Sequence, residues 1–358
     1  AQSQGAAYSK GHTRSLLADL TLSQDLSGLV KGLGVSFRLA YDNYSSIWED
    51  HSKTYAYRGY IPSWQDSSAG GPLYTVVTGG KPSEMATGAD TNDWARQFNF
   101  SGGFDYNRTF GDKHDVYSQL KWEYEYRDSY GLNTTIYRQN VSWFTHYGYD
   151  KRYFLDLALV GSGSSLLAPG HKWAFSPTVS AAWVLSEENF MKNLDWLDMF
   201  KIRASYGEVG NDELQGRRFP YISLVSTDDG GSYYFGEFRT NRVQAYRIKT
   251  LGTPNLTWEV AKKYDIGVDF SVLNGKFTGA VDYFVDKRDD IFMQRNQMPL
   301  TTGLADQTPM ANVGKMKSFG WDGNIAFTQQ IGQVNLQLRA NFTYQTTDIL
   351  DKDEAANE

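Results

Sequence analysis

Hydrophobic and polar residues alternate without a break from position 334 to position 345. Apolar side chains occupy the even positions of this segment and hydrogen-bonding side chains occupy the odd ones. Because successive side chains of a β-strand point to opposite faces, the pattern predicts a strand with one apolar face and one polar face. At about 3.3 Å per residue the strand spans about 40 Å, and at a tilt of about 45° it crosses about 28 Å. That distance is close to the apolar thickness of an outer membrane.

The same alternation predicts eleven more strands, so the predicted fold class is an all-β, antiparallel transmembrane β-barrel, of which about twelve strands are present. Their ranges are 16–22, 33–42, 98–106, 119–127, 141–147, 153–159, 173–185, 200–206, 264–270, 277–285 and 321–328. Over 119–127 the polar face reads Gln, Lys, Glu, Glu and Arg, which suits a wet lumen and would be unfavourable in lipid. The pair Asn274 and Gly275 marks one hairpin, and Ser186 as an N-cap before two glutamates predicts a short helix.

The predicted connections alternate between short and long, as do the periplasmic turns and extracellular loops of outer-membrane barrels. The short connections lie near 111–113, 149–151, 272–276 and 331–333, and the long ones are 45–92, 161–171, 210–255 and 287–312. Two connections, 128–133 and 186–198, fit this alternation poorly. We expect the two longest, 45–92 and 210–255, to lie outside the cell as loops of a single barrel domain that covers residues 1–358.

The composition fits a membrane barrel and argues against several other classes of protein. The chain of 358 residues contains 10 Trp, 24 Tyr and 20 Phe, and Trp and Tyr in particular gather at membrane interfaces. It contains no run of about 18 apolar residues, so no transmembrane helix is expected. Zero cysteines exclude disulfides and thiolate metal sites, and a net charge of -6 argues against nucleic-acid binding.

The sequence carries no motif of catalytic or cofactor-binding residues, so we expect neither an enzyme nor a bound cofactor. The acidic pairs Asp228–Asp229 and Asp289–Asp290 could bind calcium through loop carboxylates, although adjacent aspartates are more often simply solvated. Aromatic and cationic loop residues could stack on a ligand and hydrogen-bond it, or they could pack the loops together. These ligand-contact candidates are Trp64, Tyr74, Tyr233, Tyr234 and Arg239.

Several segments between positions 150 and 330 are similar to one known family. They are RYFL at 152–155, KWAFSP at 172–177, WVLSEE at 183–188, KIRASYG at 201–207, PNLTWE at 254–259, YDIGVDF at 264–270 and NVGKM at 312–316. With these segments the chain resembles the SusC/RagA-like TonB-dependent outer-membrane transporters of Gram-negative bacteria. The family often carries an Arg-Arg-Asp-Gly-Ser-Ser-Arg run where this chain has Val-Gly-Ser-Gly-Ser-Ser-Leu at 160–166, so any role of those charges cannot be carried over.

The resemblance implies a barrel of about 22 strands whose lumen holds an N-terminal plug with a TonB-contacting segment. This chain has about twelve predicted strands, no plug and a polar end, so we interpret it as an internal fragment of such a transporter. The implied function is active uptake of nutrient oligomers, either glycans or oligopeptides, energised by the TonB complex. The implied partners are a SusD-like surface lipoprotein, an oligosaccharide or peptide ligand, and outer-membrane lipid.

Two other functions share much of this pattern. A passive outer-membrane pore would have the same strands and would lack only the plug, so the sequence upstream discriminates it from an active transporter. A soluble β-rich carbohydrate-binding protein would have shorter strands, of about five or six residues, and sheet faces suited to water or to a core.

Overall fold

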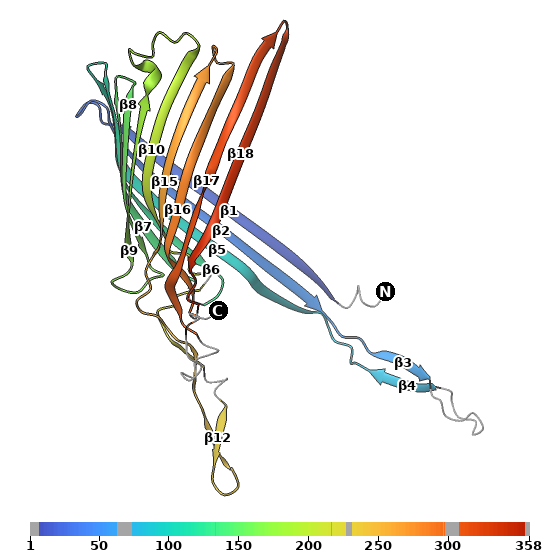
Figure 1. Ribbon diagram of the computed structural model, residues 1–358. Helices are drawn as coiled ribbons and strands as arrows, with labels where there is room; N and C mark the ends of the chain where they lie inside the picture. Colours follow the sequence, from blue (N-terminus) through green and yellow to red (C-terminus); the bar gives the residue numbers. More distant parts are fainter. Residues whose placement is uncertain are drawn as a thin grey trace. The chain divides into compact units, whose positions relative to one another are not determined.

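The computed structural model describes residues 7–62, 74–132, 134–215, 217–226, 231–295, 297 and 308–354. Within them, twelve strands form one sheet in the order β1-β2-β5-β6-β7-β8-β9-β10-β15-β16-β17-β18 (Figure 1). Their bounds are β1 (Ala7–Asp25), β2 (Leu33–Ser52), β5 (Ala86–Phe110), β6 (His114–Ser129), β7 (Ile136–Tyr149), β8 (Tyr153–Ser164), β9 (Trp173–Val184), β10 (Leu197–Asn211), β15 (Glu259–Val272), β16 (Phe277–Gln294), β17 (Met310–Ile331) and β18 (Val334–Asp351). The neighbouring strands from β7 to β18 pair antiparallel, so the predicted all-β antiparallel fold is confirmed.

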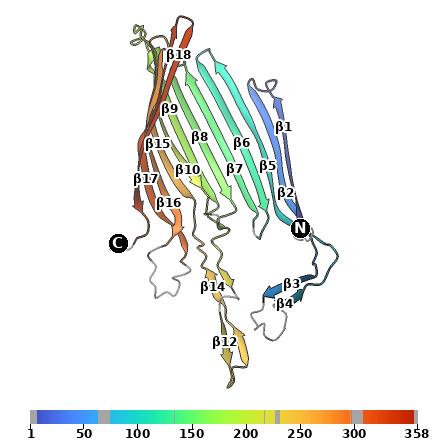
Figure 2. The same ribbon diagram turned by 90° about the vertical axis from the view of Figure 1, so that its right-hand side faces the viewer.

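Shorter elements lie in the connections between these strands. They are β3 (Tyr57–Pro62) paired with β4 (Tyr74–Gly79), β11 (Leu224–Ser226) with β14 (Arg247–Thr250), β12 (Ser232–Phe235) with β13 (Asn241–Gln244), and the 3-10 turn η2 (Leu185–Glu187) (Figure 2). The prediction that Ser186 caps a helix is wrong, because the N-cap position of η2 is Val184 and no side chain caps the turn there.

All twelve predicted strands are present, and several are longer than predicted. Strand β2 continues to Ser52 and β5 begins at Ala86, so the first long connection covers 53–85 and is shorter at both ends than the predicted 45–92. Polar residues occupy both faces of these strand ends, which hides the alternation although the backbone remains paired. The second long connection covers 212–258, between β10 and β15.

Contacts between residues divide the chain into two compact units. Unit 1 comprises Ala1–Asp19, Ala40–Phe98 and Arg127–Thr135, and unit 2 comprises Leu20–Leu39, Asn99–Tyr126 and Ile136–Glu358.

In unit 1 the buried carboxylate of Asp128 organises the short connection that fitted the predicted alternation poorly. It accepts hydrogen bonds from Arg96 Nη2 at 2.9 Å and from Thr134 Oγ1 and Thr135 Oγ1 at 3.1 Å each. These charge-assisted bonds hold the connection after β6 in a compact form, which explains how it can be short.

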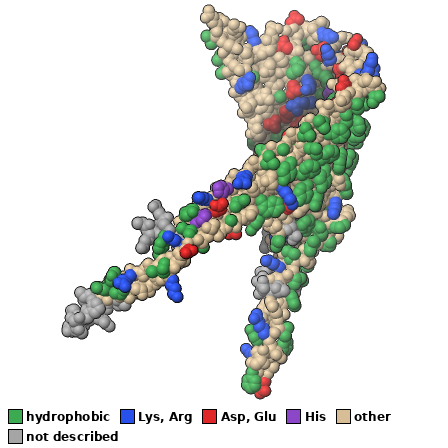
Figure 3. Space-filling model, turned by 180° about the vertical axis from the view of Figure 1, so that it is seen from behind, with side chains coloured by type: hydrophobic (Ala, Val, Ile, Leu, Met, Phe, Trp, Pro, Cys, Tyr) green, Lys and Arg blue, Asp and Glu red, His purple; other side chains and the backbone are tan. Residues whose placement is uncertain are grey.

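In unit 2 the strand register gathers apolar side chains on one face of the sheet. One row across six strands consists of Trp183, Ile202, Val268, Val281, Gly323 and Phe342. In other rows of the same face Ile266 keeps 60% of its surface exposed and Leu338 keeps 57%, so the described residues leave this face uncovered. Hydrophobic side chains form a broad continuous patch in Figure 3, and acidic and basic side chains gather apart from it.

The opposite face of the same strands is polar. The corresponding row consists of Ala182, Arg203, Gly267, Asp282, Asp322 and Thr343. The alternation of the sequence thus becomes two chemically opposite surfaces, because each strand keeps its phase relative to its neighbours.

Tight turns join the strands at one end of the sheet. Asp150 and Lys151 have φ angles of 52° and 56°, and Asn274 and Gly275 have φ angles of 58° and 73°. Turns with left-handed residues match the right-handed twist of the strands that they join. The predicted hairpin at Asn274–Gly275 is confirmed, since it connects β15 to β16. No helix in the described ranges is long and apolar enough to cross a membrane.

Candidate functional site

A network of ion pairs lies on the polar face of unit 2. Arg203 of β10 contacts two carboxylates of β15, with Nη1 3.3 Å from Asp265 Oδ1 and Nε 3.2 Å from Asp269 Oδ1. Its Nη2 donates to Asp282 Oδ2 of β16 at 2.8 Å. Lys201 Nζ also lies 3.1 Å from Asp269 Oδ2. Because the network joins three neighbouring strands, it holds this part of the polar face in one arrangement.

Gly267 makes room for the Arg203 side chain. A Cβ atom at position 267 would lie 1.9 Å from Asp282 Oδ1 and 2.8 Å from Arg203 Cζ, far inside contact distance. The guanidinium therefore crosses β15 above a residue that has no side chain, and any larger residue would displace it.

A second polar group lies on the same face of β7, β8 and β9. His146 Nδ1 hydrogen-bonds Asp156 Oδ1, and Ser180 Oγ donates to Asp156 Oδ2 at 3.0 Å. The histidine and the serine both face the carboxylate, whereas in a hydrolase triad the histidine lies between the serine and the carboxylate. We therefore interpret this group as part of a polar wall.

Eight hydrophobic side chains form a cluster, which we call the loop-base cluster, where the long connections leave the strands. They are Ile136, Leu166, Leu167, Leu214, Leu256, Trp258, Phe292 and Met310. Leu167 has no exposed surface and Leu256 keeps only 1%. Both ends of the 212–258 connection contribute to the cluster, so burial of these side chains fixes where that connection begins and ends.

Hydrogen bonds hold the same loop bases together. Arg138 Nε donates to Asp212 Oδ2 at 2.7 Å, immediately after β10. Asn312 Nδ2 donates to the carbonyl of Thr257 at 3.0 Å and to the carbonyl of Asp290 at 2.8 Å. The bases of three connections are thereby joined by polar as well as apolar contacts.

Sequence reasoning missed the part that Leu166 and Leu167 play. The segment 161–171 reads as a polar loop because Gly and Ser dominate it, and the alternation ends there. The available signal was a pair of adjacent leucines in that loop, since two apolar side chains in a polar connection favour an anchored loop.

Three of the predicted ligand-contact residues come together in one hairpin. Tyr233 and Tyr234 lie on β12 with exposed fractions of 65% and 53%, and Arg239 lies in the turn to β13 with a φ of 52°. The exposed rings leave aromatic surface available, and the turn carries a cation beside them.

The remaining candidates lie elsewhere. Tyr74, on β4 of unit 1, packs edge-on against Tyr60 with ring centroids 5.1 Å apart, which is the loop-packing alternative for this residue. Trp64, Asp228 and Asp229 lie outside the described residues.

The candidate calcium pair Asp289–Asp290 is engaged within the protein. Asp289 Oδ2 lies 3.1 Å from Lys262 Nζ, and Asp290 occupies the left-handed backbone region with a φ of 57°. Across the ranges that the structure describes, no group of three or more His, Asp or Glu side chains is arranged to hold a metal ion.

Residues 2–358 match the family described as TonB dependent receptor-like, beta-barrel. The chain belongs to this family. It is 30% identical over 252 residues to the TonB-dependent receptor P39 of Formosa agariphila, a match of 62% of this chain and 23% of P39. It is 28% identical over 218 residues to the TonB-dependent receptor SusC of Bacteroides thetaiotaomicron, a match of 59% of this chain and 20% of SusC. The matches thus cover less than a quarter of the length of these receptors.

The fold is also that of a solved transporter. The RagAB peptide importer in its closed-closed state superposes with a TM-score of 0.70 at 18% identity, over 99% of this chain and 38% of the other. The predicted resemblance to SusC/RagA-like TonB-dependent receptors is therefore confirmed. The family to which this chain belongs consists of outer-membrane transporters and receptors, and not of enzymes.

In a TonB-dependent receptor barrel, strands alternate an apolar residue outward with a polar residue inward. The exposed apolar face of unit 2 is accordingly the outer surface of the barrel wall, and the face that carries Arg203 lines the lumen.

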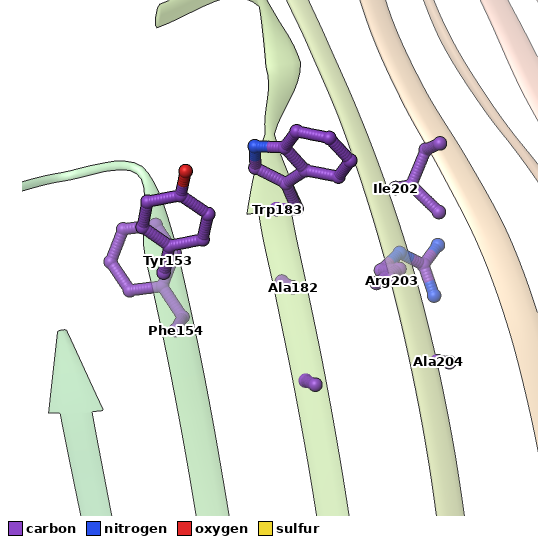
Figure 4. A pocket seen from close by; sticks show the side chains of 8 residues that line it. Tyr153, Phe154, Ala182, Trp183, Ile202, Arg203 and Ala204 are labelled. Carbon is purple, nitrogen blue, oxygen red and sulfur yellow. The ribbon is translucent and has the colours of Figure 1, made fainter. Parts of the chain in front are cut away.

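On the outer surface near the short turns, the carboxylate of Glu188 contacts three polar side chains of the barrel wall. Tyr153 Oη and Trp183 Nε1 both donate to Glu188 Oε1, and Arg152 Nη1 lies 3.3 Å from Oε2. The hydrogen bonds from Tyr153 and Trp183 hold the pKa of Glu188 below its usual value. The rings of Tyr153 and Trp183 stack with centroids 6.2 Å apart and, with Ile202, line a shallow depression (Figure 4). Tyr and Trp placed in this way are typical of a membrane interface.

Proposed function

We propose that this chain forms part of the barrel wall of an active outer-membrane importer of nutrient oligomers. The transporter takes up glycans or oligopeptides, draws energy from the TonB complex, and works with a SusD-like surface lipoprotein. The observation that carries this proposal is the two-faced sheet of unit 2, with an uncovered apolar face and a hydrogen-bonded polar face.

The polar face supports a hydrophilic cargo. Arg203, its aspartates and the His146–Asp156–Ser180 group place charged and hydrogen-bonding side chains along the lumen. A passing sugar or peptide can exchange its hydrogen bonds with water for bonds with such a wall, which an apolar cargo cannot do. The structural similarity to the RagAB peptide importer favours an oligomer over a small ion.

The candidate ligand contacts lie on the long connections, which we assign to the outside of the cell. In this proposal the exposed Tyr233 and Tyr234 stack on sugar rings or peptide side chains, and Arg239 supplies hydrogen bonds. Tyr74 is proposed as a contact from unit 1, through the ring face that its packing on Tyr60 leaves free.

Uptake in cells tests the proposal. The complete receptor is expressed in a Gram-negative host that lacks its own copy, and the cells are given fluorescent oligopeptides or fluorescent oligosaccharides. Accumulation of one class that stops when a protonophore collapses the proton gradient, or when TonB is deleted, supports an active importer. Accumulation that continues under both treatments would support a passive pore, and a receptor recovered in the soluble fraction would support the soluble binding protein.

A matched pair of variants tests the hairpin. Replacing Tyr233 and Tyr234 with Ala should weaken uptake by about tenfold or more, since stacked aromatic contacts contribute about 1 to 3 kcal/mol each. Tyr246→Ala, which removes another exposed ring from the same connection, should leave uptake unchanged. Equal effects of the two changes would remove Tyr233 and Tyr234 from the ligand site.

A further inference from the structure

Three lysines lie side by side across neighbouring strands of unit 2. The register places Lys262 of β15 opposite Lys287 of β16, and Lys287 opposite Lys317 of β17. Lys287 Nζ lies 5.8 Å from the ring centroid of Tyr264, and Lys317 Nζ lies 4.8 Å from that of Phe319. Both rings belong to the apolar face, so the lysines project from the outer surface of the wall.

Like charges directly opposite each other in a sheet are destabilising. Lys262 is compensated, because its Nζ lies 3.1 Å from Asp289 Oδ2. Among the described side chains, no carboxylate lies within 4.0 Å of the ammonium groups of Lys287 and Lys317, although Asp348 of β18 is the register partner of Lys317. Two ammonium groups on adjacent strands therefore rest on aromatic rings and form no ion pair with the side chains that the structure describes.

The row lies at the edge of the apolar band, on the side of the long connections. From Lys262 to the end of β15 at Val272 the strand runs about 33 Å, or about 23 Å across a membrane at a tilt of about 45°. This height is close to the apolar band of about 25 Å in outer-membrane barrels. In the adjoining row Tyr206 packs on Tyr264 with ring centroids 4.9 Å apart, as expected for aromatic residues at an interface.

We propose that Lys287 and Lys317 bind the phosphate of an anionic lipid headgroup in the leaflet on the side of the long connections. Lysine binds phosphate as a point charge, and two ammonium groups on adjacent strands can share one phosphate. The apolar face directly below offers the acyl chains of the same lipid a surface, which a free phosphate would not need. The inference rests on the proposed outer-membrane location and adds a ligand that the proposed transport function does not require.

Lipid binding by the complete receptor tests the inference. The purified receptor is placed in vesicles of phosphatidylcholine, in vesicles of phosphatidylcholine with lipid A, or in phosphatidylcholine with inorganic phosphate in the buffer. The double variant Lys287→Gln/Lys317→Gln should bind lipid A about thirtyfold more weakly, because each lysine near an anionic surface contributes about 1 kcal/mol. In phosphatidylcholine alone it should melt no lower than the unchanged receptor, since the variant removes a like-charge contact.

A matched control removes two positive charges at the opposite end of the strands. Lys192→Gln/Lys276→Gln, near the short turns, should leave lipid A binding unchanged. The inference would be overturned if the Lys287→Gln/Lys317→Gln variant bound lipid A as tightly as the unchanged receptor. It would also be overturned if that variant melted at a lower temperature in vesicles both with and without lipid A. Stabilisation by inorganic phosphate equal to that by lipid A would assign the lysines to free phosphate and overturn the lipid assignment.

Cell fractionation separates the two proposals. A receptor absent from the outer membrane would contradict the proposed function, whereas an outer-membrane receptor with unchanged lipid A binding in the double variant would contradict only this inference.

Discussion

Arg203 Nη2 lies 2.8 Å from Asp282 Oδ2, although the two residues are on strands that are not neighbours in the sheet. Strand β15 lies between them, and the side chain crosses it at Gly267. The ion pair therefore depends on a residue that carries no charge and makes no hydrogen bond through a side chain.

Gly267→Ala should destabilise the barrel wall by about 1 to 3 kcal/mol, because the added Cβ would overpack the site and displace the guanidinium. Unfolding of the complete receptor by urea from vesicles measures the change. Gly161→Ala on β8 is the control, since a Cβ there would lie 3.9 Å from its nearest neighbour and should be nearly neutral. Equal stabilities of the two variants would show that Gly267 is not needed for the ion pair.

Opposite faces of β18 should respond differently to substitution. Leu338→Arg places a charge on the apolar face and should cost about 2 to 4 kcal/mol if the position lies near the middle of the membrane. Arg339→Ala on the polar face should cost far less. Refolding titrations of the complete receptor into bilayers measure both changes, and equal or reversed effects would contradict the assignment of the two faces.

Leu167→Ala should disrupt the loop-base cluster, because it leaves a cavity at a side chain with no exposed surface. Substitutions of this kind cost about 2 to 5 kcal/mol. The melting temperature and the rate of proteolysis within the 212–258 connection report the loss. Leu132→Ala removes a side chain that is 93% exposed and should change neither measurement.

The short-turn end of the sheet, around Glu188 and Asp150, should become less stable at acidic pH. Hydrogen bonds from Tyr153 and Trp183 lower the pKa of Glu188, and the hydrogen bond from Arg152 lowers the pKa of Asp150. A carboxyl group whose pKa is lowered by folding stabilises the fold above its unfolded pKa, which is 4.5 for Glu188, and loses this effect as the pH falls. The protection of the amides around η2 against hydrogen exchange, measured relative to the intrinsic exchange rate at each pH, should therefore fall below about pH 4.5.

Glu188→Gln should remove much of that pH dependence, because the amide side chain does not titrate. Glu187→Gln, a change of the same charge at the neighbouring position, should preserve it. Identical exchange profiles for Glu188→Gln and the unchanged receptor would exclude Glu188 as the titrating group.

Labelling on intact cells tests which connections face outward. A single Cys at Ser232, beside the candidate ligand contacts, should react with an impermeant maleimide, whereas a Cys at Lys276 in the β15–β16 turn should react only after the outer membrane is opened. The inverse pattern would reverse the topology and exclude the 212–258 connection from ligand capture.

The strands could be predicted because their cause is local. A period of two residues appears wherever one face meets lipid and the other meets water, as in residues 334–345, and it needs no knowledge of neighbouring strands. The ends of β2 and β5 were missed because polar residues on both faces erase the period while backbone hydrogen bonds continue. The hairpins β3–β4 and β12–β13 were missed for the related reason that their strands are short.

The polar network could not be predicted from the sequence. Lys201, Arg203 and Asp269 are visible as charged residues on polar positions, but their partners depend on the register between strands that are far apart in sequence. The same is true of Leu167, which belongs to a buried cluster with side chains from five other segments. The ligand-contact residues of the long connections stay predictions, because stacking on a ligand leaves no mark in the unbound chain.

The loop-base cluster fixes both ends of the 212–258 connection, and this affects how far the sequence between them can vary. The entropy lost on closing a loop grows only slowly with its length, so the loop-base cluster leaves the enclosed segment free to lengthen, shorten or be exchanged at little expense to stability. Under the proposed function, such a receptor acquires specificity for a new ligand by replacing the residues between Leu214 and Leu256 while the barrel wall stays the same. Chimaeras between related receptors joined at these two leucines are therefore expected to fold.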